Sequence, residues 1–261
     1  MVRRRNTAKP FKALYLALLL LFLYLPIAVM IILSFNASAS RGAWGGFTLA
    51  WYKELFQHEE IIDALWVTLS VAACATVAAT ALGAFGAIGM HSMSAGWANA
   101  LTNISYLPMT TPDIVTGVSL MLMFVFLKIP RGWGTMLMAH IAFDTPYVVF
   151  AVLPRLRQMN PNTYEAALDL GCKPFEAIWK VIIPEALPGI LTGALLAFTM
   201  SLDDFVISYF TTLTDQNLST IVYSAAKLGV KPYMYALSTL MFLAILSLLL
   251  IINRRSSLEE L

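Results

Sequence analysis

Long apolar stretches without charged residues constrain this chain more than any other feature. The interior of a membrane is about 30 Å thick and offers the backbone no water, so about 20 apolar residues in a helix are needed to cross it. Apolar residues make up 59% of the 261 residues and charged residues 12%, against roughly 45–50% and ~25% in a soluble domain. The mean hydropathy is +0.74. We therefore expect an integral membrane protein and exclude a soluble enzyme, a nucleic-acid-binding protein and a secreted disulfide scaffold.

Six stretches are long and apolar enough to be membrane-spanning helices. They are predicted at about 13–34, 64–89, 101–127, 134–154, 185–207 and 233–252. The first is longer than the ~7–15 apolar residues of a secretory signal, so we expect a span and not a cleaved leader. The predicted fold is all-α, with residues 1–261 forming a single transmembrane domain.

Lysine and arginine are distributed unequally between the two sides that these spans define. Eleven of the 17 fall on the side of both termini, and the others fall on the opposite side. The first group is Arg3, Arg4, Arg5, Lys9, Lys12, Arg155, Arg157, Lys173, Lys180, Arg254 and Arg255, and the second is Arg41, Lys53, Lys128, Arg131, Lys227 and Lys231. Because cytoplasmic loops carry an excess of these residues, we predict that both termini are cytoplasmic.

The predicted outer connection, residues 35–63, is rich in aromatic residues. Leu49, Tyr52, Leu55 and Phe56 would share one face of a helix, which predicts a short helix lying in the membrane interface. Two functions remain open for it. One is an aromatic membrane anchor, and the other is a lid or a docking surface for an external partner.

The predicted inner connection, residues 155–184, reads as two short helices joined at a glycine. Asn162 or Thr163 can cap the first helix, and Gly171 can end it. Pro174 can begin the second, which we expect to run through Trp179. Pro184 then precedes the fifth span. The pattern predicts a compact knob projecting from the membrane.

The same connection contains a spaced motif. It consists of Glu165-Ala166-Ala167, then Gly171, then Val181-Ile182-Ile183-Pro184. The motif resembles the coupling loop of bacterial ABC importer permeases. This resemblance implies that the loop binds a separate ATPase subunit, with Glu165, Ala166, Ala167, Gly171 and Pro184 as the coupling residues.

The resemblance extends over nearly the whole chain and is closest to the second permease subunit of spermidine/putrescine importers. The stretches that support it are Tyr24-Leu25-Pro26, Leu33-Ser34-Phe35-Asn36, Trp51-Tyr52, Pro112-Asp113-Ile114-Val115, Glu165 to Gly171 and Ser201-Leu202-Asp203-Asp204. It implies a permease in a bacterial cytoplasmic membrane that imports polyamines handed over by an external binding protein. It also implies two further partners, a second homologous permease subunit and a pair of cytoplasmic ATPase subunits.

The chain carries no G-x-x-x-x-G-K-[ST] loop that would cradle nucleotide phosphates. We therefore expect that it is not an enzyme, that it binds no cofactor, and that ATP and Mg²⁺ bind to the ATPase. Cys74 and Cys172 lie far apart and have no neighbouring ligands, so no metal site is expected. Small residues suited to close helix packing are Gly83, Gly86 and Gly89 in the second span, and Gly189 and Gly193 in the fifth.

Four aspartates lie within the predicted spans, which contain no lysine or arginine. They are Asp113, Asp144, Asp203 and Asp204. Carboxylates inside a membrane are costly and usually face a bundle interior or a path. The set therefore favours a path for a cationic substrate, and the rings of Tyr147, Phe205 and Tyr209 can supply cation–π contacts.

Each aspartate also has a structural alternative. Asp113 follows Pro112 and can begin a helix that restarts after a break at Pro108 and Pro112. Asp144 can serve the kink expected at Pro146. Asp203 and Asp204 would lie ~100° apart on a helix. We therefore expect Asp203 to face the path, and Asp204 to bond to the partner subunit or face outer water.

His140 in the fourth predicted span allows two interpretations. With Asp144 it can form a proton relay, as in a proton-coupled secondary carrier. We favour a buried histidine that bonds to a neighbouring helix. Within the ABC permease interpretation, another cationic or amine-containing cargo remains the alternative to a polyamine.

Overall fold

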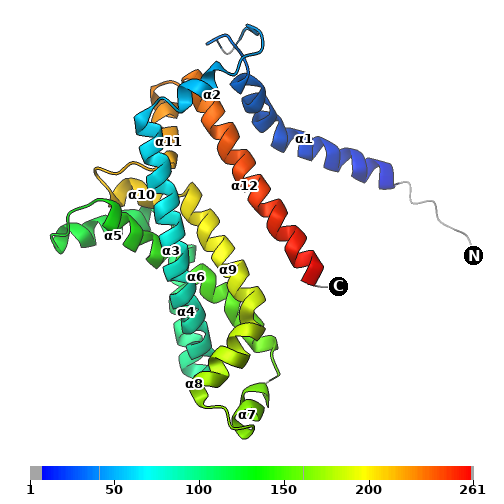
Figure 1. Ribbon diagram of the computed structural model, residues 1–261, viewed down its shortest axis with the longest axis vertical. Helices are drawn as coiled ribbons and strands as arrows, with labels where there is room; N and C mark the ends of the chain where they lie inside the picture. Colours follow the sequence, from blue (N-terminus) through cyan, green and yellow to red (C-terminus); the bar gives the residue numbers. More distant parts are fainter. Residues whose placement is uncertain (1–7, 41, 161, 260–261) are drawn as a thin grey trace, which may run out of the picture. The chain divides into compact units, whose positions relative to one another are not determined.

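The computed structural model describes residues 8–40, 42–160 and 162–259, and every element of these ranges is a helix (Figure 1). Arg3, Arg4, Arg5 and Arg41 of the predicted charge bias lie outside the described residues. The chain forms two compact units. One contains the residues up to Glu59 and those from Ser224 onward, and the other contains Glu60–Tyr223.

The first unit is built from α1 (Ala8–Ser34), α2 (Ala50–Leu55) and α12 (Pro232–Glu259), and α12 packs against both of the others. The segment between α1 and α2 is organised by Asn36. Its side-chain oxygen accepts the Gly45 N–H at 2.7 Å, its amide donates to the Ala43 carbonyl at 2.8 Å, and its own carbonyl accepts from the Trp51 indole. These bonds add to an isolated antiparallel bridge between Asn36 and Phe47 and satisfy backbone groups of the segment.

The predicted short helix in the outer connection is confirmed as α2, but its apolar residues do not share one environment. Leu55 is buried, whereas Leu49 and Phe56 are exposed. The Tyr52 hydroxyl is 2.7 Å from the Ser34 hydroxyl at the end of α1. Two of the four predicted face residues are thus left on the surface of the chain.

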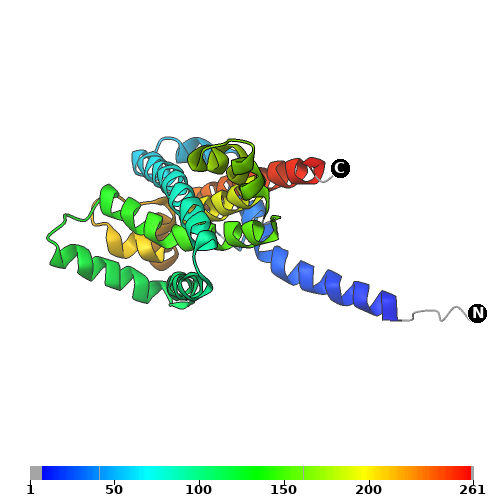
Figure 2. The ribbon, with the colours of Figure 1, turned by 90° about the horizontal axis from the view of Figure 1, so that it is seen from below.

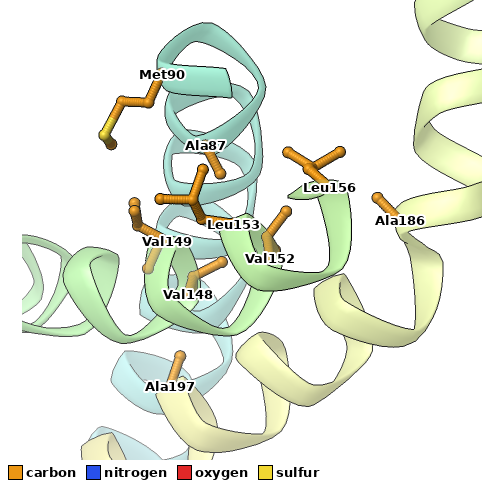
Figure 3. Close-up of a cluster of buried hydrophobic side chains, with 10 residues drawn as sticks. Ala87, Met90, Val148, Val149, Val152, Leu153, Leu156, Ala186 and Ala197 are labelled. Atoms are coloured by element: carbon orange, nitrogen blue, oxygen red, sulfur yellow. The ribbon is translucent and has the colours of Figure 1, made fainter. Parts of the chain in front are cut away.

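The core of the second unit lies between α3 (Glu59–Ser92), α6 (Trp133–Gln158) and α9 (Ile183–Asp203). Figure 3 shows α6 side chains directed toward α3 on one side and α9 on the other. The labelled residues are Val148, Val149, Val152, Leu153 and Leu156 of α6, Ala87 and Met90 of α3, and Ala186 and Ala197 of α9. Because these α6 positions recur at helical spacing, they form one continuous apolar stripe.

Three of the five predicted packing glycines allow helices to approach α6 closely. A Cβ atom at Gly83 would lie 2.6 Å from Val148 Cβ, one at Gly189 would lie 2.9 Å from the Ala151 carbonyl oxygen, and one at Gly193 would lie 3.0 Å from Val148 Cα. Gly86 has only a distant neighbour at 3.9 Å and Gly89 has none within 4 Å. The second predicted span, in α3, is therefore packed closely against α6 at Gly83 but not at Gly89.

The third predicted span, 101–127, is broken in two, as the alternative of a helix restart at Asp113 predicted. It is α4 (Ala95–Thr110) followed by α5 (Asp113–Phe126), with a bend of 102° between them. In Figure 2, α4 is seen nearly end-on while α5 lies across the view. The predicted break is confirmed at Pro112 and is wrong at Pro108, which lies inside α4. Thr111 has extended backbone with ψ 135°, which is the conformation that a following proline imposes.

The fifth predicted span, 185–207, is wrong at both ends. At its C-terminal end α9 stops at Asp203, and the separate helix α10 (Val206–Thr211) follows. At its N-terminal end the helix continues back through η1 (Ile178–Ile182) and α8 (Pro174–Ala177), so Pro184 does not mark the start of the helix. The π-helical segment η1 ends where the Ile183 N–H bonds to the Ile178 carbonyl. This extra residue per turn accommodates Pro184, which cannot donate a helical hydrogen bond.

Among the described residues, four helical stretches are long and apolar enough to cross a membrane. They are Lys12–Ser34, Glu59–Ser92, Trp133–Gln158 and Pro174–Asp203. The bent pair α4 and α5 makes a fifth when it is taken as one broken span. The described apolar part of α12, Pro232–Ser247, is shorter. The chain is therefore all-α with several helices of membrane-spanning length.

Candidate transport path and coupling loop

The four predicted path aspartates lie at element ends or inside α6. Asp113 is the first residue of α5, immediately after the 102° bend, and its side chain is exposed. The prediction that Asp113 begins a helix is thus confirmed. At this position its carboxylate also interacts favourably with the helix dipole. Its exposure leaves the carboxylate accessible to a ligand.

Asp144 is the most isolated of the four. It lies within α6 with an exposed fraction of 0%, and neither carboxylate oxygen has a hydrogen-bond partner among the described residues. Pro146 lies inside the same helix, and the neighbouring Thr145 hydroxyl donates to the Ile141 carbonyl instead. Asp144 therefore makes no hydrogen bond that would stabilise a kink. A buried carboxylate without a partner is costly.

Tyr147 lies one helical turn from Asp144 and is within electrostatic reach of both Asp144 and Asp113. Its ring packs against that of Phe143, with 5.3 Å between ring centroids. The side chain is half-buried. The fold thus brings together Asp113, Asp144 and Tyr147, three residues that the sequence analysis selected separately.

Asp203 and Asp204 differ sharply, and the expected surroundings of Asp204 are wrong. Asp203 is exposed, but the Asp204 side chain is only 8% exposed. Its two carboxylate oxygens accept the backbone N–H groups of Ile207 at 3.2 Å and Ser208 at 2.7 Å. Asp204 therefore caps the first turn of α10 inside its own chain. The sequence analysis missed this role because it continued the fifth helix through residue 207.

His140 is buried in α6 and bonds to two other helices, as predicted. Its Nδ1 is 2.6 Å from the Ser201 hydroxyl of α9, and its Nε2 is 2.9 Å from the Ser208 hydroxyl of α10. Asp204 Oδ2 lies 3.4 Å from Nε2. Since both ring nitrogens are engaged elsewhere and the Asp144 oxygens have no partner, His140 and Asp144 do not form the direct hydrogen bond of a proton relay.

Ser201, Ser208 and Asn217 lie around His140 and Asp204, but the sequence analysis did not select them as site residues. The Asn217 amide donates to the Ser208 hydroxyl at 2.8 Å and to the Asp204 carbonyl at 2.9 Å. All three side chains are buried. The sequence does contain a feature that could have identified the two serines: Ser201 and Ser208 flank the Asp203-Asp204 pair in an apolar stretch. Polar side chains that are buried in such a stretch need hydrogen-bond partners.

The predicted coupling loop begins with α7 (Asn162–Asp169), which ends at Gly171 as expected. Gly171 has φ +90°, the Cys172 N–H bonds to the Ala167 carbonyl, and the Gly171 N–H bonds to the Leu168 carbonyl. This bond pattern is a Schellman motif, in which glycine is the favoured residue. The predicted cap at Asn162 or Thr163 is wrong, because the Asn160 side-chain oxygen accepts the Asn162 N–H at 3.0 Å.

The short helices of the loop pack against one another, and each buries an alanine. Ala167 of α7 and Ala177 of α8 are buried, and both helices also contact η1. Glu165, Ala166, Gly171 and Pro184 are exposed. Large apolar side chains on the same segment are exposed too: Leu170 (88%), Phe175 and Trp179. An exposed apolar surface of this kind marks an interaction site.

Within the described ranges, no three His, Cys, Asp or Glu side chains lie close enough together to hold a metal ion. Cys74 is exposed on α3, and Cys172 is partly exposed in the coupling loop.

The helices of membrane-spanning length define a membrane protein, and comparison with known proteins gives its family. Residues 79–257 match the family of binding-protein-dependent transport system inner membrane components. The chain belongs to this family of ABC importer permeases. It is therefore a membrane component of a bacterial transporter.

Curated relatives match most of the chain. The putrescine transport system permease protein PotI of Escherichia coli K12 is 37% identical over 228 residues, covering 83% of this chain and 80% of the relative. The spermidine/putrescine transport system permease protein PotC of the same strain is 34% identical, covering 85% and 84%. PotC of Haemophilus influenzae is 36% identical, covering 84% and 85%.

A solved structure shares the fold at lower identity. It is a chain of a bacterial alginate ABC transporter in complex with an alginate pentasaccharide-bound periplasmic protein. The TM-score is 0.70 at 19% identity, covering 97% of this chain and 96% of the other. The permease fold is thus established over nearly the full chain.

Proposed function

We propose that this chain is a permease subunit of an ATP-driven importer for putrescine or spermidine. The single observation that carries the cargo assignment is the 34–37% identity to putrescine and spermidine/putrescine permeases over more than four fifths of the chain. The chemistry of the spans supports it. A polyamine carries several ammonium groups on an aliphatic stem, and carboxylates and aromatic rings suit both parts.

The proposed path runs past Asp113, Tyr147, Asp144 and Asp203, with Asp204 holding the nearby helix end. Asp113 and Asp203 are exposed and can meet an ammonium group directly. Asp144 is buried without a partner, and a passing cation would offset the cost of that carboxylate. Tyr209, 55% exposed, and Phe205 supply aromatic surface beside Asp203.

The other subunits of the proposed transporter are those expected for this family. An external binding protein delivers the polyamine, a second homologous permease subunit completes the path, and two cytoplasmic ATPase subunits bind ATP and Mg²⁺. The exposed surface of Glu165, Ala166, Leu170, Phe175 and Trp179 is the proposed ATPase contact. This assignment requires six spans, with α12 as the sixth, and both termini in the cytoplasm of a bacterial inner membrane.

The cargo is tested by uptake of labelled putrescine and spermidine into bacteria that lack polyamine importers. The cells carry the complete transporter with the native chain, with Asp203→Asn, or without this chain. We expect uptake with the native chain alone, at equal expression. Equal uptake with both chains would keep the cargo and remove Asp203 from the path. No uptake with either would refute the polyamine assignment and leave the family intact.

A further inference from the structure

The break between α9 and α10 is held by a buried polar cluster, defined here as His140, Ser201, Asp204, Ser208 and Asn217. We infer that this cluster is a positioning device: it fixes the break so that Asp203 and the Phe205–Tyr209 rings are presented to the substrate path. The inference rests on the proposed function for the role of Asp203, but its geometry can be tested without any cargo.

The break leaves backbone groups that need new hydrogen-bond partners. The helix ends at Asp203 and restarts at Val206, which leaves backbone N–H and carbonyl groups without helical partners. Buried groups of this kind need partners inside the protein. Asp204 accepts the N–H groups of Ile207 and Ser208, and the Asp204 carbonyl accepts from Asn217. The freed Leu202 carbonyl accepts from the Ser219 hydroxyl at 3.3 Å.

His140 joins both sides of the break to a third helix. One ring nitrogen bonds to Ser201, in the last turn of α9, and the other bonds to Ser208 in α10. The ring is 2% exposed, so these bonds are shielded from solvent. α10 has only six residues, too few to hold a helical conformation or a direction on its own. His140 and the cap at Asp204 hold the first turn of α10, while packing against α5 and the Thr135 bond to the Thr211 carbonyl hold its other end.

The cluster gives the adjacent carboxylates of Asp203 and Asp204 different roles. Asp204 turns inward to the cluster, whereas Asp203 stays exposed. Beyond the break, the Phe205 ring stacks on Tyr223 at 3.9 Å between centroids and lies 5.5 Å from the ring of Tyr209. If α10 changed its direction relative to α9, the rings of Phe205 and Tyr209 would change their position relative to Asp203. His140 is thus a positioning residue that acts on the path through α9 and α10.

The test uses the complete transporter in proteoliposomes, with His140→Leu, His140→Gln and the control Thr76→Val. Thr76 on α3 also loses one side-chain hydrogen bond, to the Ala72 carbonyl, but lies outside the cluster. We expect His140→Leu to raise the KM for putrescine about tenfold while Vmax changes little, since a buried bonding partner is lost. Glutamine can bond on two sides, so His140→Gln should restore most of the affinity, and Thr76→Val should match the native chain.

A second readout follows the break itself. Tyr209→Cys, in a chain with Cys74→Ala and Cys172→Ser, is labelled with a water-soluble maleimide, with and without His140→Leu. We expect the labelling rate to change severalfold with His140→Leu and to remain unchanged with Thr76→Val. If His140→Leu does not assemble, Ser208→Ala removes the Nε2 partner and keeps the ring.

The two proposals fail differently. Native transport combined with an unchanged KM and labelling rate in His140→Leu would overturn the positioning role and leave the polyamine function standing. An altered labelling rate in a transporter that moves no polyamine would support the positioning role and refute the cargo. A raised KM that His140→Gln does not restore would also count against the hydrogen-bonding mechanism.

Discussion

At the scale of the residue, Asp144 should matter for transport and not for stability. Both of its carboxylate oxygens lack partners in the described chain, so Asp144→Asn has no hydrogen bond to lose. We expect the thermal unfolding temperature of the purified complex to stay the same or rise. Polyamine uptake should fall more than about tenfold, because a cation in the path loses a buried counter-charge.

Asp215→Asn is the matched control for Asp144→Asn. Asp215 Oδ2 accepts the Trp133 N–H and the Thr214 hydroxyl, each at 2.8 Å, so this carboxylate already has internal partners. We expect a lower unfolding temperature and retained uptake per folded complex. Normal uptake by Asp144→Asn in a folded complex would remove Asp144 from the path.

At the scale of the element, the close approach of α3 to α6 depends on Gly83. A methyl group there would overlap Val148 and approach the Thr145 carbonyl to 3.0 Å. We expect Gly83→Ala to destabilise the folded chain by ~1–3 kcal/mol. Gly89→Ala, on the same helix with nothing within 4 Å, should be neutral or slightly stabilising. Detergent-resistance and thermal unfolding curves compare the two, and equal curves would refute this packing.

The turn at Gly171 sets the direction from α7 into α8. Its φ of +90° is unfavourable for a residue with a side chain, so Gly171→Ala should cost ~1–2 kcal/mol or reorient the loop. We expect polyamine-stimulated ATP hydrolysis by the complex to fall, and to fall less with Gly171→Asn, because asparagine tolerates this conformation better. Gly96→Ala, with nothing within 4 Å of its Cβ and no positive φ, is the control. Unchanged ATP hydrolysis with Gly171→Ala would show that coupling to the ATPase does not depend on the turn at Gly171.

The elements show where sequence reasoning succeeds and where it stops. Apolar length located the long helices, Pro112 located the α4–α5 break, and Gly171 located the end of α7. The break at Asp204 carries neither proline nor glycine, so local sequence gave no stop signal. Its cause is tertiary, since the partners His140 and Asn217 lie 64 residues before and 13 residues after Asp204. For the same reason, helical spacing predicted that Asp203 and Asp204 face different ways, but it did not predict that Asp204 bonds to α10 of its own chain.

At the scale of the whole molecule, the two native cysteines test the proposed orientation without added reporters. Cys172 is partly exposed in the coupling loop, whereas Cys74 lies in the membrane-length helix α3. A charged maleimide that does not cross membranes should label the chain in inside-out vesicles and not in intact spheroplasts. Cys172→Ser should abolish this labelling, and Cys74→Ala should leave it unchanged, because a thiol within the bilayer reacts poorly with a charged reagent.

The same cysteine reports on the ATPase contact. If the surface that includes Leu170 and Phe175 docks on the ATPase, the bound subunit covers the adjacent Cys172. Vesicles stripped of peripheral proteins should therefore be labelled faster than intact vesicles, and adding purified ATPase back should restore protection. Labelling from the outside would reverse the orientation argued from the lysine and arginine distribution. Equal rates with and without the ATPase would instead place its contact elsewhere, because a surface that stays open to a soluble reagent is not the docking surface.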